Sequence, residues 1–243
     1  MRQLLQIVST FGVALGISCA SYGGHATAST IVAPIGAKAS TTFSSSGNNY
    51  SILHTFDQSG LSSKYVSGET NFDNYLAGNP IHTSLASGRE WFSQDYGKNR
   101  IARQTVTYTF GALTSINGFA LWNEEFAGIG TTQLWWAAAD GKYTLFDTIK
   151  PADSAFGSNY LAEIFAFDNP INMLFFRLVI LDCLGPPSSE SKYRGCGIGE
   201  VAFSADLGPR DNNSIVPLPA ALPLLGSALG LFVWMGRRRK SCN

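Results

Sequence analysis

The sequence predicts an all-β protein, an antiparallel β-sandwich of jelly-roll type spanning residues 29–206. Three observations lead to this prediction. About eight short segments either alternate apolar and polar residues or are apolar throughout, and they are evenly spaced. Many of the 25 glycines and 10 prolines fall between them as turn signals. Long amphipathic patterns of helical period are scarce, which argues against an α/β fold.

The expected strands follow one another with short connections. In the clearest one, residues 105–110 (TVTYTF), a valine, a tyrosine and a phenylalanine share one face and the threonines share the other. The other expected strands are residues 51–56, 116–122, 131–138, 143–149, 161–167, 173–180 and 198–204. Asp140-Gly141 and Asn169-Pro170 predict turns between strands.

One of these strands is predicted to be central. Residues 173–180 (MLFFRLVI) are nearly all apolar, which is typical of a strand covered on both faces. Arg177 lies in its middle and therefore needs a partner or an edge position, because burying an unpaired charge is costly.

The N-terminal segment predicts export. Arg2 is followed by an apolar stretch, residues 7–20, and then by the small-residue pattern Ala26-Thr27-Ala28. This order is typical of a cleavable signal peptide over residues 1–28, with the mature chain starting at Ser29. The alternative is a buried N-terminal helix.

The cysteines then predict one disulfide. Cys19 would leave with the signal peptide and Cys242 lies near the C-terminus, so Cys183 and Cys196 remain. In an oxidising compartment these two are expected to pair. The alternative, metal ligation, lacks further cysteine or histidine nearby.

The charge distribution argues against nucleic-acid binding. Without Arg2 and the basic tail residues 237–240, the chain keeps 12 basic and 17 acidic residues. An acidic body without a basic cluster cannot supply the cationic contacts that phosphate groups need.

The C-terminal segment predicts a membrane anchor. Residues 218–235 carry no charge and would reach about 27 Å as a helix, close to the thickness of the hydrocarbon core. Pro219 and Pro223 are tolerable near the start of such a helix. The basic residues 237–240 follow directly, and the positive-inside rule keeps them cytoplasmic. Residues 207–215 form a polar linker before this segment.

This tail closely resembles the VPLPA variant of the PEP-CTERM sorting signals of exopolysaccharide-producing Gram-negative bacteria. The matching residues are Val216, Pro217, Leu218, Pro219 and Ala220, followed by the apolar helix and the basic end, over residues 216–240. The resemblance implies recognition and cleavage by an exosortase. The chain would then be anchored in the inner membrane before processing and reach the cell surface or extracellular matrix afterwards.

The body resembles the galactose-binding-like jelly roll of discoidin and coagulation-factor C-type domains. The features that carry the resemblance occur in the family's order: residues 56–62 (FDQSGLS), 89–93 (REWFS), 116–125 (INGFALWNEE), 135–146 (WWAAADGKYTLF) and 198–204 (IGEVAFS). Asp140-Gly141 takes the place of the family's turn, and Glu200 that of the glutamate in its final strand.

The resemblance implies a structural calcium ion between the loop after the first strand and the last strand. Asp57, Thr70 and Asp73 in the loop, together with Glu200, are the expected ligands, because calcium prefers six to eight oxygen atoms. The alternative is a solvated polar loop in which Glu200 makes an ordinary hydrogen bond.

The same resemblance also implies a sugar-binding face. Trp135 and Trp136 are adjacent on a strand and therefore point to opposite faces, one to the core and one outward. Loop residues would complete the site by stacking and polar contacts: Trp91, Arg89 and Asp95, with Tyr75 and Tyr96. The alternative is that these aromatic residues close the core, which is also what we expect of Trp122.

The sequence offers little support for catalysis. It contains neither an H-E-x-x-H zinc pair nor a G-x-S-x-G nucleophile elbow. Glu124-Glu125 is interpreted as surface charge. We therefore expect an exported, non-catalytic surface or matrix protein that binds a glycan or exopolysaccharide. The alternatives are a secreted hydrolase of matrix polysaccharide, with carboxylates from distant strands, and a purely structural surface protein.

Overall fold

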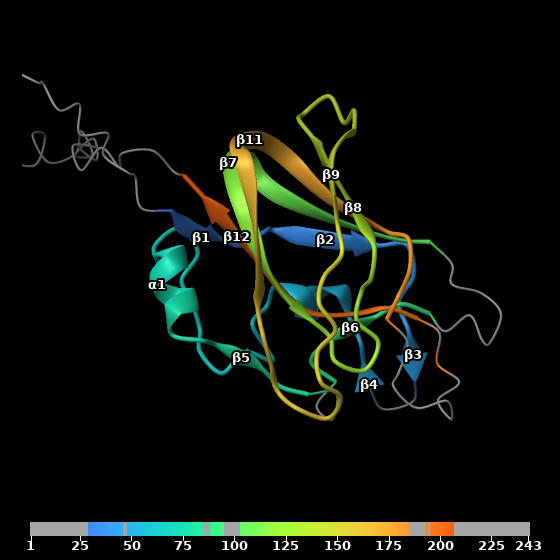
Figure 1. Ribbon diagram of the computed structural model, residues 1–243. Coiled ribbons are helices and arrows are strands. Elements are labelled where there is room, and N and C mark those ends of the chain that lie inside the picture. Colours follow the sequence, from blue (N-terminus) through green and yellow to red (C-terminus); the bar gives the residue numbers. More distant parts are fainter. Residues whose placement is uncertain are drawn as a thin grey trace, which may run out of the picture.

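The chain folds mainly into a single antiparallel β-sheet of eight strands that is bent into two layers (Figure 1). This computed structural model describes residues 29–45, 48–84, 88–94, 103–184, 193 and 195–206. The strands of the large sheet are β1 (Thr30–Val32), β2 (Gly36–Ala39), β6 (Trp91–Phe92), β7 (Gln104–Asn123), β8 (Thr132–Ala137), β9 (Thr144–Ile149), β11 (Glu163–Ile180) and β12 (Gly197–Ala205). Two small pairs stand apart, β3 (Ser44–Ser45) with β4 (Asn48–Asn49), and β5 (Ile81–His82) with β10 (Tyr160–Leu161).

Strands β7 and β11 each run through both layers. They pair with each other from Glu163 opposite Leu121 to Ile180 opposite Gln104. The register shifts twice in β11, between Ala166 and Ile171 and between Met173 and Phe175, where the paired strands bend.

The bends correct the predicted strand list. Residues 105–110 and 116–122 belong to one strand, and so do residues 163–167 and 173–180. Asn169-Pro170 is therefore not a turn between strands. Proline lacks the N–H group that a regular ladder uses, so it is tolerated at the first register shift of β11.

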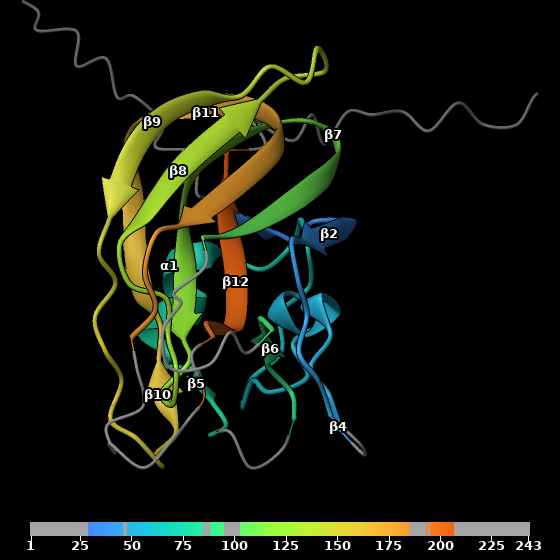
Figure 2. The ribbon, with the colours of Figure 1, turned by 90° about the vertical axis from the view of Figure 1, so that its right-hand side faces the viewer.

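The first layer has the order β1, β12, the C-terminal half of β7 and the N-terminal half of β11. The second layer has the order β2, the N-terminal half of β7, the C-terminal half of β11, β8 and β9. Figure 2 shows the two layers facing each other, with β7 and β11 curving from one to the other. The predicted antiparallel sandwich is confirmed, and residues 173–180 are central between β7 and β8. The expectation that both faces of this strand are covered is wrong, because Phe175 and Arg177 on its outer face stay partly exposed.

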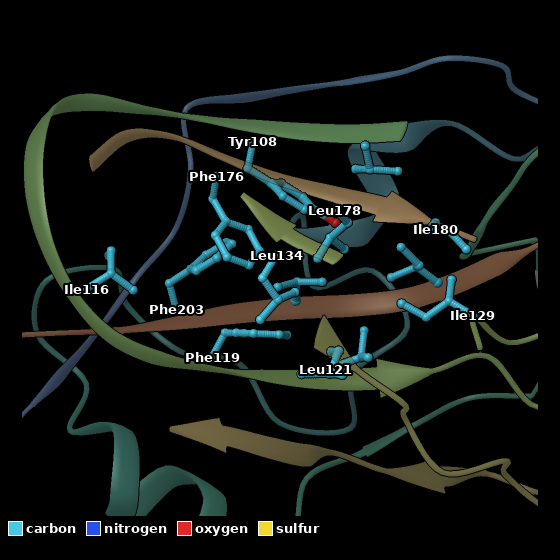
Figure 3. Close-up of a cluster of buried hydrophobic side chains, with 14 of the residues drawn as sticks. Tyr108, Ile116, Phe119, Leu121, Ile129, Leu134, Phe176, Leu178, Ile180 and Phe203 are labelled. Carbon is cyan, nitrogen blue, oxygen red and sulfur yellow. The ribbon is translucent and has the colours of Figure 1, made fainter. Parts of the chain in front are cut away.

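The space between the layers is filled by aromatic and branched side chains (Figure 3). Tyr108 and Phe176 reach in from the second layer, and Phe119 and Phe203 from the first; all four are fully buried. Phe203 lies within ring-packing distance of the other three, with centroids 5.5, 5.2 and 6.2 Å away respectively.

The outer face of the first layer is also covered. Leu61, Tyr65 and Phe72, from the segment between β4 and β5, pack against Trp122 and Ala202. As a result every residue of β12 is buried. The indole nitrogen of Trp122 donates a hydrogen bond to the Pro80 carbonyl at 2.9 Å, which confirms its predicted packing role.

The covering segment contains two short helices in place of a predicted strand. Residues 51–56 were expected to be extended, but Ile52–Thr55 form the 3₁₀-helix η1. The Ser51 side chain accepts a hydrogen bond from the Leu53 amide and starts this turn. The α-helix α1 (Phe72–Ala77) begins after Asn71, whose side chain caps it in the same way.

Two local predictions on the second layer and its flank are confirmed. Cys183 and Cys196 form a disulfide. Arg177 has partners: its Nε donates to the Thr107 hydroxyl at 3.0 Å, and its guanidinium lies over the Tyr143 ring.

The predicted signal peptide, linker and sorting tail lie outside the described residues. Within the part of the chain that the structure describes, no helix is both long enough and apolar enough to cross a membrane.

Two leucines on β7 provide a matched test of the core. Leu121 is fully buried, whereas Leu113 is 59% exposed at the bend. We expect Leu121→Ala to lower the free energy of unfolding by about 2–5 kcal/mol, because it leaves a cavity. Leu113→Ala should change it by less than about 0.5 kcal/mol. Urea unfolding of both variants measures the difference, and equal effects would contradict the described packing.

Candidate functional site

Five aromatic side chains form a hollow at one end of the sandwich, which we call the aromatic cup. The cup has a volume of about 230 Å³. Its residues are Phe43, Tyr50, Phe92, Phe126 and Tyr193. Neighbouring rings lie with their centroids between 5.1 and 6.0 Å apart, mostly tilted or edge to face. Phe92 is nearly buried and forms the floor, while the other four are half-buried.

The floor of the cup is fixed by β6 and the disulfide. Phe92 pairs with Gly197 at the start of β12, and its carbonyl accepts a hydrogen bond from the Phe43 amide at 2.7 Å. Ser93 follows and exchanges hydrogen bonds with Cys196. The Tyr193 hydroxyl donates to the Ser93 carbonyl at 2.7 Å. This hydrogen bond positions Tyr193 as a wall of the cup.

Phe126, whose ring lies next to that of Tyr193, is fixed by the turn after β7. Glu124 Oε2 accepts hydrogen bonds from the amides of Phe126 and Ala127, at 2.9 and 2.6 Å. The Asn123 side chain bonds both the amide and the carbonyl of Ile129. In these bonds, side chains pair with backbone N–H and C=O groups of the turn, which lack partners in the sheet. They also set the position of the Phe126 ring.

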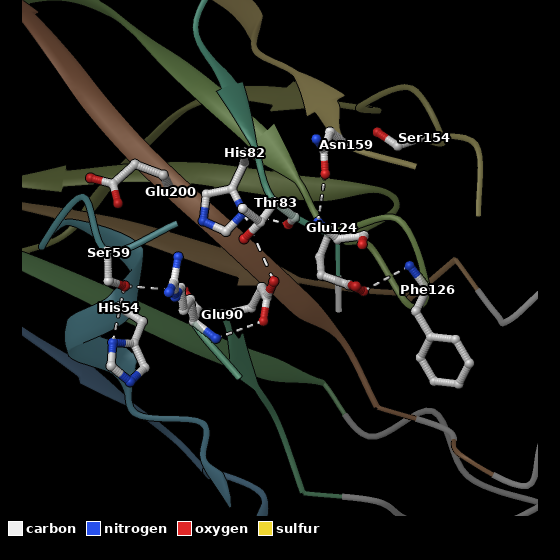
Figure 4. Close-up of polar contacts among 12 residues, drawn as sticks. His54, Ser59, His82, Thr83, Glu90, Glu124, Phe126, Ser154, Asn159 and Glu200 are labelled. Atoms are coloured by element: carbon white, nitrogen blue, oxygen red, sulfur yellow. Dashed lines mark hydrogen bonds and ion pairs between the residues drawn. The ribbon is translucent and has the colours of Figure 1, made fainter. Parts of the chain in front are cut away.

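A buried acidic cluster lies next to the turn that carries Phe126; Figure 4 labels three of its five members, His82, Glu90 and Glu124. We use this name for Glu90, Glu124 and Glu125 together with His82 and Tyr160. The five residues are buried, with exposed fractions between 0 and 3%. The sequence interpretation of Glu124-Glu125 as surface charge is wrong: both residues lie in the turn after β7, which folds back onto the sheet.

Burial controls the charge of the cluster. It raises the pKa of Glu90 to about 7 and that of Glu124 to about 8, and the nearby Glu125 adds to both shifts. Burial also lowers the pKa of His82 to about 4. At neutral pH the imidazole is therefore uncharged and the Glu124 carboxyl is mainly protonated.

Four polar atoms of the cluster have no hydrogen-bond partner among the described residues: His82 Nε2, Glu90 Oε1, Glu124 Oε1 and the Tyr160 hydroxyl. Their solvent-exposed area is negligible. Leaving such atoms unpaired is costly, so this region contributes less to stability than its burial suggests.

The residues predicted to bind sugar are scattered by the fold. Trp91 is fully buried on β6 and donates to the Thr41 carbonyl, so it cannot stack on a ligand. Trp136 packs against the core and Trp135 lies on the outer face of the second layer, which confirms that they point to opposite sides. The side chain of Arg89 is exposed beside the acidic cluster. Asp95 and Tyr96 lie outside the described residues, and Tyr75 packs on Tyr65 away from the cup.

The predicted calcium ligands are only partly brought together. Glu200 is fully buried on β12; it accepts hydrogen bonds from the Gln58 amide at 3.0 Å and the Tyr65 hydroxyl at 3.2 Å. Asp57 is next to Gln58, whereas Thr70 bonds the Val66 amide and Asp73 is exposed on α1. Among the described residues, no three histidine, cysteine or acidic side chains form a metal-binding group. Calcium stays a prediction, because these contacts neither require nor exclude it.

The sequence gives little sign of the aromatic cup. Its members come from five separate segments between residues 43 and 193, and none belongs to a recognisable motif. The one available signal is the disulfide prediction, which indicates that the loop carrying Tyr193 is constrained.

The acidic cluster predicts a pH dependence of stability. Glu90 and Glu124 hold protons in the folded state that the unfolded chain releases near pH 4.5, so their contribution falls as pH rises toward 8. His82 acts oppositely, but only between pH 4 and 6.5. We therefore expect the free energy of unfolding to fall between pH 6.5 and 8.5. Each pKa unit by which a carboxyl group differs between the folded and the unfolded chain corresponds to about 1.4 kcal/mol.

Urea unfolding at pH 6.5 and 8.5 measures this fall. Glu124→Gln should reduce it, because glutamine cannot release a proton; Glu69→Gln makes the same change on an exposed side chain and serves as control. An unchanged fall in Glu124→Gln would show that this carboxyl is not responsible.

Comparison with known proteins adds a similarity at the level of the fold. No family model matches the sequence, and no curated protein matches it. Similar solved structures include a family 32 carbohydrate-binding module (CpGH89CBM32-5) from Clostridium perfringens in complex with GalNAc-β-1,3-galactose. It is 14% identical, and the match covers 69% of this chain and 93% of that one, with a TM-score of 0.44.

Two further structures are similar to about the same degree. One is the family 32 module of C. perfringens NanJ with galactose, at 11% identity, 72% and 98% coverage and a TM-score of 0.45. The other is a chitosan-binding module from Paenibacillus sp. IK-5, at 13% identity, 71% and 95% coverage and a TM-score of 0.43. At this identity and TM-score the similarity does not assign a ligand to this chain.

Proposed function

We propose that the chain is a non-catalytic glycan-binding module and that the aromatic cup is its binding site. The observation that supports this proposal is the gathering of five aromatic rings around one open hollow at a loop end of the sandwich. Exposed ring faces bind the C–H faces of sugars, and a fixed scaffold keeps the entropy loss of binding small.

The size and chemistry of the cup indicate which part of a glycan it holds. A volume of about 230 Å³ lies below the roughly 300–1,000 Å³ of pockets for drug-sized ligands. The lining is almost entirely aromatic, and the carboxyl groups beneath it are buried. The cup therefore suits one terminal sugar unit that carries an apolar substituent, such as the methyl group of an acetamido or 6-deoxy sugar.

The alternatives have less support in the arrangement. A glycoside hydrolase needs two carboxyl groups that reach the bond to be cleaved. Glu90 and Glu124 lie close to each other, but neither has exposed surface in this structure. A purely structural protein does not account for an open aromatic hollow, since exposing such rings to water is unfavourable.

The proposal includes the route of export expected from the sequence. The chain would cross the membrane with residues 1–28 as signal peptide, and an exosortase would process the tail at Val216–Ala220. The cup would then face the cell surface or matrix. The Cys183–Cys196 disulfide supports this location, because such bonds persist in oxidising compartments.

The binding site can be tested with two aromatic variants and one control. Phe126→Ala and Tyr50→Ala should each weaken binding to neutral oligosaccharides ending in an N-acetylhexosamine or a 6-deoxyhexose by about tenfold, as expected for lost ring stacking. Trp135→Ala removes a partly exposed aromatic ring on the second layer and should leave this binding unchanged. The measurement is a glycan array followed by calorimetry on the full chain.

Thermal unfolding should first establish that all three variants fold. If only Trp135→Ala lost binding, the site would be the sequence-predicted tryptophan and not the cup. If the wild-type chain bound no neutral glycan ending in these sugars, the proposed function would be wrong.

A further inference from the structure

The outer face of the second layer carries a straight row of side chains, which we call the outer row. The strand register places Lys38 of β2 opposite Thr107 of β7, Thr107 opposite Arg177 of β11, Arg177 opposite Trp135 of β8, and Trp135 opposite Leu145 of β9. Opposed residues in neighbouring antiparallel strands point to the same face. Their opposite-facing neighbours Tyr108 and Leu178 are buried in the core, so the outer row points to solvent.

The outer row is open to solvent and partly preorganised. Lys38 is exposed, Leu145 is 42% exposed, and Thr107, Arg177 and Trp135 are half-buried. The Thr107 hydroxyl and the Tyr143 ring hold the Arg177 side chain in place, at 3.0 and 3.3 Å. An arginine fixed in this way loses less conformational entropy when it binds a carboxylate.

A second cation is tied to the same face. Arg103 Nη2 donates to Gln133 Oε1 at 3.0 Å, and the Trp135 indole donates to the same oxygen at 3.3 Å. Gln133 thus links Arg103 to the outer row. Among the described residues, no carboxylate lies within ion-pair distance of Lys38, Arg103 or Arg177.

The acidic residue of β9, Asp147, is not part of the outer row. Asp147 on β9 lies opposite the buried Leu134 and lines a hollow with Phe146 and Phe167, between β9 and the bend of β11. The face is therefore cationic on a protein whose body carries more acidic than basic residues. The overall composition of the body, with 12 basic and 17 acidic residues, would instead predict a surface with excess negative charge.

We propose that the outer row is a second binding site, separate from the aromatic cup, for a chain of uronic-acid residues. Such a chain would lie across the strands. Neighbouring strands are about 4.8 Å apart, close to the length of one sugar unit, so each unit meets a new side chain. Arg177, Lys38 and Arg103 would bind carboxylates, Thr107 would bind hydroxyl groups, and Trp135 would stack on a ring.

Charge complementarity favours this occupant over a nucleic acid. Three cations spread over a face with hydroxyl groups and one indole suit a polymer with one charge per sugar unit. A duplex carries about one charge per 1.7 Å and is bound by denser cationic patches. The two occupants are distinguished by the experiment.

The test uses the full chain and a galacturonic-acid oligomer, with its carboxyl-reduced form as a neutral probe of the same length. We expect the acidic oligomer to bind at low salt, and binding to disappear near 1 M salt, where the screening length is about 3 Å. The neutral form should not bind at this face. Lys38→Gln with Arg103→Gln should weaken binding by about tenfold, as expected for two surface charge contacts.

Lys64→Gln, which removes an exposed charge from the segment covering the other layer, is the matched control and should have no effect. Trp135→Ala should also weaken binding, whereas Phe126→Ala in the cup should not, so that failure here is distinguishable from failure of the proposed cup. Thermal unfolding establishes that each variant is folded. The proposal would be overturned if the acidic oligomer did not bind, if the Lys38/Arg103 variant bound as well as wild type, or if an oligonucleotide bound more tightly through the same residues.

Discussion

The pairing of β7 with β11 holds both layers of this protein together. Each of these strands crosses from one layer to the other, and they stay hydrogen-bonded to each other on both sides of the bend. Every other strand of the large sheet pairs directly with one of the two, or with a strand that does. The bends bring the two layers face to face, and the packed rings around Phe203 fill the space between them.

Strand β12 is buried on both faces. It lies beside β7 in the first layer, with the inner core on one side and the Leu61–Phe72 covering segment on the other. Polar side chains near this strand and its neighbours, such as Glu200, His82 and Glu124, are therefore removed from water. They avoid part of the cost of burial by staying uncharged at neutral pH or by accepting backbone hydrogen bonds. The bonds that Glu124 makes also position the ring of Phe126.

The two layers consequently offer different surfaces. The outer face of the first layer is covered by a loop and the helix α1, whereas that of the second layer carries partly exposed side chains across five strands. Apolar aromatic residues gather at one end, around the disulfide, and cations lie on the open face.

Local pattern determined much of the fold. The alternation of residues 105–110, the apolar run 173–180 and the isolated pair Cys183 and Cys196 predicted a sandwich, its central strand and its disulfide, and the opposite orientation of Trp135 and Trp136 followed from strand geometry alone. Tertiary structure decided the strand boundaries, the burial of single side chains and the candidate site, because these depend on which strands pair and where they bend. The register shifts joined expected pairs of strands into single ones and placed Pro170 inside β11. The fold also buried Trp91 and Glu124, and it brought Phe43 to Tyr193 across 150 residues of sequence. A period-2 pattern specifies on which side of its own strand a residue lies, but not what meets it there.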